Sequence, residues 1–130
     1  MNDLTEIYAY GMMPRFWRKT MESLKGSETR PNKKEVETCK AWIKKYCKPK
    51  KATKNGRAFS SYFLKHRVEA TNGLTCYVSN GAFIQAAVDL GYEFVRDDQA
   101  SINVYFFMTI DKEILKPTNL YRAAQVIAIA

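Results

Sequence analysis

Three cysteines and one histidine are the residues of this sequence best suited to metal binding or nucleophilic chemistry. Cys39, Cys47 and Cys76 include no CxxC pair, and His66 is the only histidine. Zinc sites combine cysteine and histidine ligands at short spacings that these four residues do not provide. We therefore expect reduced thiols and a protein that is active without a metal ion or any other cofactor.

The histidine has a strongly basic local environment. His66 lies between Lys65 and Arg67, whose positive charges disfavour protonation of the imidazole and should lower its pKa. A catalytic centre could form around this histidine, but a lone histidine on a helix is more often a packing or surface residue. We interpret it in the second way.

Two adjacent aspartates, Asp97 and Asp98, offer a possible cation site because hard cations take carboxylate oxygens. A turn explains them better, since the short aspartate side chain bonds nearby backbone groups. The nucleotide-binding patterns GxxxxGK[ST] and GxGxxG are absent, as is the zinc-protease pattern HExxH. We expect a binding protein and not an enzyme.

Charge is distributed unevenly along the 130 residues. Residues 28–67 hold thirteen basic and three acidic residues, whereas residues 68–130 hold four basic and seven acidic ones, within a formal net charge of +8. A polyanion would meet residues 28–67 first, which favours nucleic acid as the partner. A solvated lysine face that only keeps the protein soluble is the alternative interpretation.

Basic residues are interleaved with aromatic ones, as in proteins that hold phosphates while bases stack on rings. Tyr105 and Phe107 alternate with apolar residues of a predicted strand, so we expect both on its exposed face. Asn80 begins a predicted helix that we place near the nucleic acid. The candidate nucleic-acid-binding residues are Lys40, Lys44, Lys45, Lys48, Lys50, Lys51, Lys54, Arg57, Lys65, Arg67, Asn80, Tyr105 and Phe107.

Three helices are predicted from apolar periodicity and capping residues. Residues 33–47 carry one apolar stripe with lysines on the other faces, and Asn32 can cap them. Ser60 or Ser61 can cap the next helix, which Asn72 and Gly73 would end.

The third helix has the strongest N-cap of the sequence, Ser79. Gly91 follows its predicted end. We expect its buried side to consist of Phe83, Ile84, Ala87 and Val88.

Residues between and after these helices suggest loops and strands. Residues 48–56 are predicted to form a mobile basic loop, and residues 74–78 a short β-prone connection. Residues 92–95 and 102–108 alternate in hydrophobicity, which predicts an antiparallel hairpin. Residues 111–115 suit one helical turn, and residues 117–130 fit either a helix or a strand.

The order of elements predicts an α+β fold, mostly helical with a β-hairpin, in a single domain over residues 1–130. Residues 1–58 form its basic helical part, with two short helices in residues 4–24 and Pro14 opening the second. Residues 59–110 have the helix, strand, helix, hairpin order of a winged-helix-like module. Their connection over residues 72–78 is longer than the turn of a standard helix-turn-helix.

Three stretches carry a resemblance to other proteins: SSYFLKHRVE at residues 60–69, YVSNGAFIQAAVDLGY at residues 77–92 and NVYFFM at residues 103–108. They resemble small proteins carried by phages and integrative elements, with the patterns SSYxLKHxVE, YVSNGxFIxAAxxxGY and NxYF. The resemblance covers about two fifths of the chain. It implies an origin in a mobile element and no particular activity.

Two functions follow from these observations. The first is a nucleic-acid-binding accessory protein of a phage or mobile element, binding DNA or RNA without catalysis. The second is an anti-defence protein, similar to an anti-CRISPR inhibitor, that binds a host protein or ribonucleoprotein. The N-terminal residues lack the pattern of a secretory signal, and apolar runs are far shorter than the roughly 20 residues of a membrane span. We therefore expect a cytoplasmic protein of the host cell.

Overall fold

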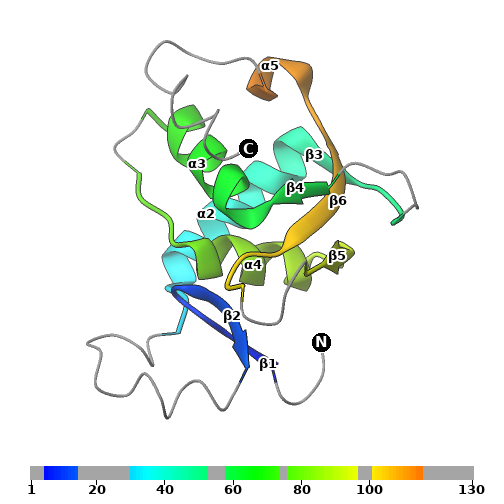
Figure 1. The fold of residues 1–130 in the computed structure, drawn as a ribbon. Helices are drawn as coiled ribbons and strands as arrows, with labels where there is room; N and C mark the ends of the chain where they lie inside the picture. Colours follow the sequence, from blue (N-terminus) through cyan, green and yellow to red (C-terminus); the bar gives the residue numbers. More distant parts are fainter. Residues whose placement is uncertain (1–4, 15–29, 53–57, 74–75, 97–100, 116–130) are drawn as a thin grey trace.

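The computed structural model describes residues 5–14, 30–52, 58–73, 76–96 and 101–115, which form an α+β fold (Figure 1). The α+β class predicted from the sequence is confirmed. The helices are α2 Lys33–Tyr46, α3 Ser61–Thr71, α4 Asn80–Asp89 and α5 Lys112–Leu115. The strands are β1 Thr5–Tyr8, β2 Gly11–Pro14, β3 Cys47–Pro49, β4 Ala58–Ser60, β5 Phe94–Val95 and β6 Tyr105–Ile110.

Each of the three long helices begins at the predicted cap. The side chains of Asn32, Ser60 and Ser79 each accept a hydrogen bond from the backbone N–H three residues later, at 3.0 to 3.2 Å. Such a bond satisfies one of the donors that the first turn of a helix leaves unpaired. Gly73 and Gly91 follow α3 and α4 with φ of 81° and 83°, a conformation in which glycine carries no steric penalty.

Strand β6 is the centre of the four-stranded sheet. Strand β4 pairs with one side of it, and β3 pairs antiparallel with the other. The N–H of Phe107 donates to the Glu93 carbonyl, while its carbonyl accepts from the Lys50 N–H. Because the N–H and C=O of one strand residue point to the same side, β5 and β3 lie one after the other along the same edge of β6. The predicted antiparallel pairing is confirmed, although the strands cover Phe94–Val95 and Tyr105–Ile110 instead of residues 92–95 and 102–108.

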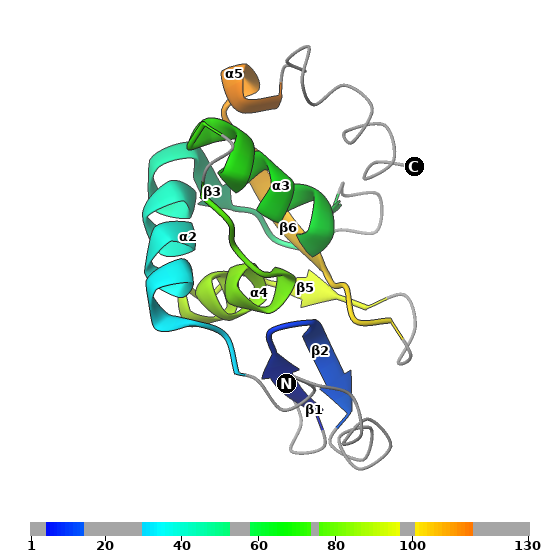
Figure 2. The ribbon, with the colours of Figure 1, turned by 90° about the vertical axis from the view of Figure 1, so that its left-hand side faces the viewer.

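The core lies between the inner face of this sheet and helices α2, α3 and α4 (Figure 2). Phe83 of α4 packs edge-on against Trp42 of α2 and Phe106 of β6, with ring centroids 6.2 and 6.0 Å apart. The predicted buried side of α4 is confirmed: Phe83, Ile84 and Ala87 are fully buried, and Val88 packs partly buried against the core.

The N-terminal segment differs from its prediction. Residues 5–14 form an antiparallel hairpin of β1 and β2, not a helix, and Pro14 is the last residue of β2. The apolar positions fit a helix locally, but packing on α4 selects the hairpin (Figure 2). The Gly81 N–H donates to the Ala9 carbonyl at 3.0 Å. A Cβ at Gly81 would lie 1.6 Å from the Tyr8 carbonyl oxygen, so the hairpin depends on a glycine there. Residues 15–24 lie outside the described residues.

The remaining predictions have mixed outcomes. Helix α2 ends at Tyr46, and β3 takes up residue 47 of the predicted helix and residues 48–49 of the predicted basic loop. Of the predicted β-prone connection, residues 76–78 are described and form no strand. The helical turn in residues 111–115 is confirmed as α5, and residues 117–130 lie outside the described residues. The winged-helix-like arrangement stays a prediction. None of the helices in the described ranges is long and apolar enough to span a membrane.

Candidate nucleic-acid interface

Five predicted binding residues gather where α2 passes into β3. Lys44, Lys45, Lys48, Lys50 and Lys51 are all exposed, and we refer to residues 44–51 as the lysine segment. The burial patterns of α2 and β3 explain this exposure. Helix α2 turns its apolar stripe inward and leaves its last lysines outside, and β3 buries Cys47 while Lys48 and Pro49 stay exposed.

The backbone of the lysine segment is anchored to the sheet. The Lys50 N–H donates to the Phe107 carbonyl at 3.2 Å. Two residues on, the Ala52 N–H donates to the Glu93 carboxylate at 2.7 Å. The lysine side chains therefore project from a backbone that is held in place.

A groove of about 390 Å³ lies beside the lysine segment. Its lining residues are Lys44, Lys45, Tyr46, Cys47, Lys48, Thr109, Ile110 and Asp111. Lys48 pairs with Thr109 across the strands, so both side chains stand on the same, outer face of the sheet. The Asp111 N–H donates to the Tyr46 carbonyl at 2.9 Å and closes one end of this region. Three lysines thus line a single hollow together with two hydroxyl-bearing residues and one carboxylate residue.

The charge of the lysine segment is not neutralised within the part of the chain that the structure describes. No carboxylate there forms an ion pair with its five lysines. Asp111 lines the groove, but one of its oxygens accepts from the Glu113 N–H and so caps α5. The positive charges of Lys44 and Lys45 also interact favourably with the negative, C-terminal end of the α2 dipole. The Lys45 ammonium also lies 5.2 Å from the centre of the Tyr46 ring, and neither lysine has a carboxylate partner among the described residues.

A second hollow, of about 590 Å³ between β1, α2 and α4, differs in its charges. Arg30 pairs with Glu6 at 2.9 Å, and Lys40 pairs with Asp89 at 3.2 Å. The Asp89 carboxylate raises the pKa of Lys40 through this contact. Lys40 was a predicted binding residue, but its partners already compensate its charge. We therefore leave it out of the interface.

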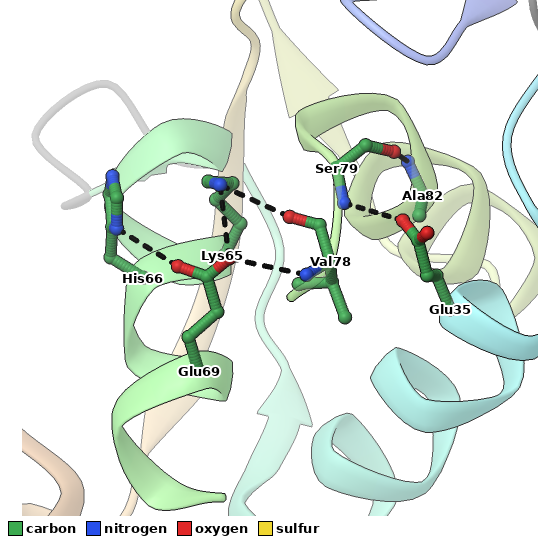
Figure 3. A network of polar contacts seen from close by, with 7 residues as sticks. All are labelled: Glu35, Lys65, His66, Glu69, Val78, Ser79 and Ala82. Atoms are coloured by element: carbon green, nitrogen blue, oxygen red, sulfur yellow. Dashed lines mark hydrogen bonds and ion pairs between the residues drawn. The ribbon is translucent and has the colours of Figure 1, made fainter. Parts of the chain in front are cut away.

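Two other predicted phosphate contacts lie in the interior. The Lys65 ammonium donates to the Glu69 carboxylate and to the Val78 carbonyl, both at 3.1 Å, and Lys65 is 7% exposed (Figure 3). Arg67 is 4% exposed and donates to the Ile114 carbonyl. We expected both on the surface because they are charged, whereas their positions on α3 point both side chains toward partners in the interior. The prediction that they contact phosphates does not fit these positions.

Asn80 and Phe107, two further predicted binding residues, are also buried. The Asn80 amide donates at 2.9 Å to the Tyr10 carbonyl and to the Asn103 side chain, which ties the N-terminal hairpin to the approach to β6. The prediction that Phe107 is exposed is wrong: it is 8% exposed because β6 has neighbouring strands on both sides. Tyr105 is half-buried and stays a candidate contact.

His66 takes part in the buried network around Glu69 (Figure 3). Its Nδ1 lies 3.1 Å from the Glu69 carboxylate. The pKa of His66 is lowered, mainly by burial and then by the neighbouring Lys65 charge, against the opposing influence of Glu69. The predicted direction is confirmed, and burial is a cause that the sequence did not supply.

The three cysteines are free thiols, as predicted. Burial raises the pKa of Cys47 to about 12 and that of Cys39 well above its ordinary range, so neither is a reactive thiolate at neutral pH. In the described ranges no three His, Cys, Asp or Glu side chains gather as a metal site. Lys54, Arg57, Asp97 and Asp98 lie outside those ranges.

Thr109 and Asp111 line the groove, yet sequence reasoning did not select them. They meet Lys48 through the pairing of β3 with β6, strands about 60 residues apart, for which no local signal exists. Glu69 was also missed, although its i, i+4 spacing from Lys65 is a signal that could have indicated the pair. Searches against protein-family models, curated proteins and solved structures found no match to this chain.

Proposed function

We propose that this protein binds nucleic acid through phosphate contacts of the lysine segment, without catalysis. One observation carries the proposal: five exposed lysines follow one another over residues 44–51 and have no acidic partner among the described residues. The groove beside three of them adds a concave surface that hydroxyl-bearing residues also line. Unpaired cations on an anchored backbone suit a polyanion.

The chemistry of lysine indicates what such binding would recognise. An ammonium group on a flexible stem holds a phosphate as a point charge and forms no fixed fork toward a base edge. Phosphate contacts set position and affinity, whereas base contacts set sequence preference. We therefore expect binding that depends strongly on salt and only weakly on sequence.

The test replaces Lys45 and Lys48 with glutamine and compares duplex affinity over a range of salt concentrations. Each phosphate contact contributes roughly −0.9 to the slope of log affinity against log salt, so this variant should flatten the slope by up to about 1.8. Lys33→Gln with Lys34→Gln is the matched control. These lysines are also exposed, but they lie at the opposite end of α2.

Equal slopes for the two double variants would show that only the net charge matters and would remove the lysine segment as an interface. Absence of salt-dependent binding by the wild-type protein would contradict the proposal as a whole. Recovery of a host defence protein that resists nuclease treatment would then favour the anti-defence function instead.

The biological setting rests on the resemblance of residues 60–69, 77–92 and 103–108 to proteins of phages and integrative elements. From this resemblance we propose that the protein is an accessory protein of a mobile element that acts on nucleic acid in the cytoplasm of its host. Expression from a mobile element, followed by crosslinking to nucleic acid in the host cell, would test that setting.

A further inference from the structure

The groove beside the lysine segment offers more than positive charge. It lies where the end of α2 and strand β3 meet the end of β6. Among the described residues that line it, Tyr46 is the only aromatic one and Asp111 the only acidic one. A row of lysines alone would suit any polyanion. The ring and the carboxylate indicate a ligand that also has a flat face and hydrogen-bond donors.

Tyr46 is held in position before a ligand arrives. Its ring is half-buried, and its centre lies 5.7 Å from that of the Trp42 ring. Trp42 is 4% exposed, and its indole N–H donates to the Thr71 hydroxyl at 3.1 Å, so Tyr46 packs on a fixed neighbour. The Lys45 nitrogen lies 5.2 Å from the centre of the Tyr46 ring. A base stacked on Tyr46 would therefore have a cation close by for its phosphate, the combination that single-strand binding proteins use.

Asp111 is exposed and can accept further hydrogen bonds. One of its oxygens accepts from the Glu113 N–H at 2.9 Å, but a carboxylate has about four lone-pair sites. Among the described residues it forms no ion pair with the lysines of the groove. A carboxylate repels a phosphate, whereas it accepts a hydrogen bond from the amino group of a base such as cytosine. Its place in the groove thus favours a ligand that carries an amino group.

The size of the groove favours an unpaired base over a duplex. Its volume of about 390 Å³ lies within the roughly 300–1,000 Å³ typical of a pocket for one small ligand. In a duplex both faces of a base are covered by its neighbours, so Tyr46 could stack only on a base that has left the helix. The bases of a single strand offer their faces directly to a ring.

We infer that the groove holds one unpaired base of a single-stranded nucleic acid. The base stacks on Tyr46 and donates a hydrogen bond from its amino group to Asp111, while Lys45 and Lys48 hold the adjacent phosphates. This inference rests on the proposed function, because it takes nucleic acid as the ligand. It explains why a ring, a carboxylate and three lysines line the same hollow.

The first test varies the ligand and leaves the full chain unchanged. The protein should bind a single-stranded oligonucleotide more tightly than a hairpin duplex of the same length and base composition at the same salt concentration. A strand of abasic units keeps the phosphates and lacks the bases, so it should bind more weakly than the single strand by roughly 5-fold or more, the value of one stacked base. Fluorescence anisotropy of labelled strands measures the three affinities.

The second test removes the ring. Tyr46→Leu keeps an apolar side chain against Trp42 and should lower single-strand affinity by roughly 5-fold or more. The slope of log affinity against log salt should not change, because no charge is altered. Tyr46→Phe keeps the ring and should bind as the wild type does. Denaturant melts check that each variant is folded, and the abasic strand decides the question if Tyr46→Leu is not.

Tyr77→Leu is the matched control for the second test. Tyr77 is 67% exposed and its ring centre lies 4.5 Å from the nitrogen of Lys65. It thus also combines a ring with a lysine, but away from the groove. This substitution should leave single-strand affinity unchanged.

The third test concerns the edge of the base. Cytosine carries an amino group that thymine lacks, so Asp111→Ala should lower the ratio of the affinity for a cytosine strand to that for a thymine strand. Affinity for the abasic strand should rise instead, since a negative charge is removed beside the lysines. An unchanged ratio would overturn the contact between Asp111 and the base.

Equal affinity of the wild type for the single strand and the duplex would overturn the inference. A folded Tyr46→Leu variant with full single-strand affinity would overturn it too, as would a loss of affinity in Tyr77→Leu in its place. In these cases salt-dependent binding through Lys45 and Lys48 would remain, and the proposed function would stand. Absence of binding to any of the strands would contradict the proposed function itself.

Discussion

Lysine has opposite roles in two regions of this molecule. In the lysine segment, five side chains are exposed and lack acidic partners among the described residues. In α3, Lys65 is buried and bonded to Glu69 and Val78, and it joins two parts of the fold. In the net charge calculated from the composition, the lysines of both regions count equally. Burial and bonding partners therefore decide which lysines can meet a ligand and which ones stabilise the fold.

The largest expected effect concerns the core against which both regions are built. Phe83→Ala removes a fully buried ring that contacts Trp42 and Phe106. We expect the free energy of unfolding to fall by roughly 3–5 kcal/mol, because apolar burial is lost and a cavity remains. Urea melts measure it. A loss below about 1 kcal/mol would mean that the Phe83 side of α4 is not part of the core against which both regions pack.

The next effect tests whether the α3 charges are structural. Glu69→Ala leaves the Lys65 ammonium buried without a carboxylate, and we expect a loss of about 3 kcal/mol. Replacing both partners, as Lys65→Met with Glu69→Leu, should recover part of that loss because no buried charge remains unpaired. A stable Glu69→Ala variant would place Lys65 in the same class as the surface lysines.

A smaller effect depends on pH. The pKa of His66 is lowered in the folded protein, so protons bind preferentially to the unfolded chain. This contribution to stability is complete above the unfolded value of 6.5 and is lost as the pH falls through the lowered pKa. His66 is the only histidine. The wild type should therefore lose more stability than His66→Gln between about pH 7.5 and about pH 5.5. Parallel losses in the two proteins would show that His66 is not responsible.

The smallest effect is expected in the lysine segment. Replacing Lys44, Lys45 and Lys48 with glutamine should lower the free energy of unfolding by no more than about 1 kcal/mol, since exposed side chains contribute little and only Lys44 and Lys45 interact with the α2 dipole. Denaturant melts beside those of Glu69→Ala make the contrast direct. A large loss would show that these lysines stabilise the fold, as the alternative interpretation of a structural lysine face allows.

Local signals in the sequence predicted the local parts of the fold. Caps at Asn32, Ser60 and Ser79 and the buried side of α4 were found because each depends on residues within one or two turns. The hairpin of residues 5–14 was missed because its selection depends on Gly81, about 70 residues away. The central position of β6 is equally remote from any local pattern.

The candidate site was also predicted only where it depends on local signals. The exposure of the α2 lysines follows from the helical periodicity predicted for that segment, whereas Lys48 was expected to be exposed in a loop and is exposed in β3. The burial of Lys65 and Arg67 does not follow in the same way, because their partners Val78 and Ile114 come from later segments of the chain. Charge counted along a sequence cannot distinguish a side chain that meets solvent from one that meets a distant carbonyl.

The central position of β6 has a consequence for synthesis of the chain. Strands β3, β4 and β5 all pair with β6, which follows them in sequence and ends at Ile110. Ribosomes add about 5–20 residues per second, so roughly 50 residues and several seconds of translation separate β4 from its partner. During that interval the nascent chain presents unpaired strand edges, to which other chains or chaperones can bind. A transcript truncated before the codons of β6 would yield a product in which this exposure is permanent.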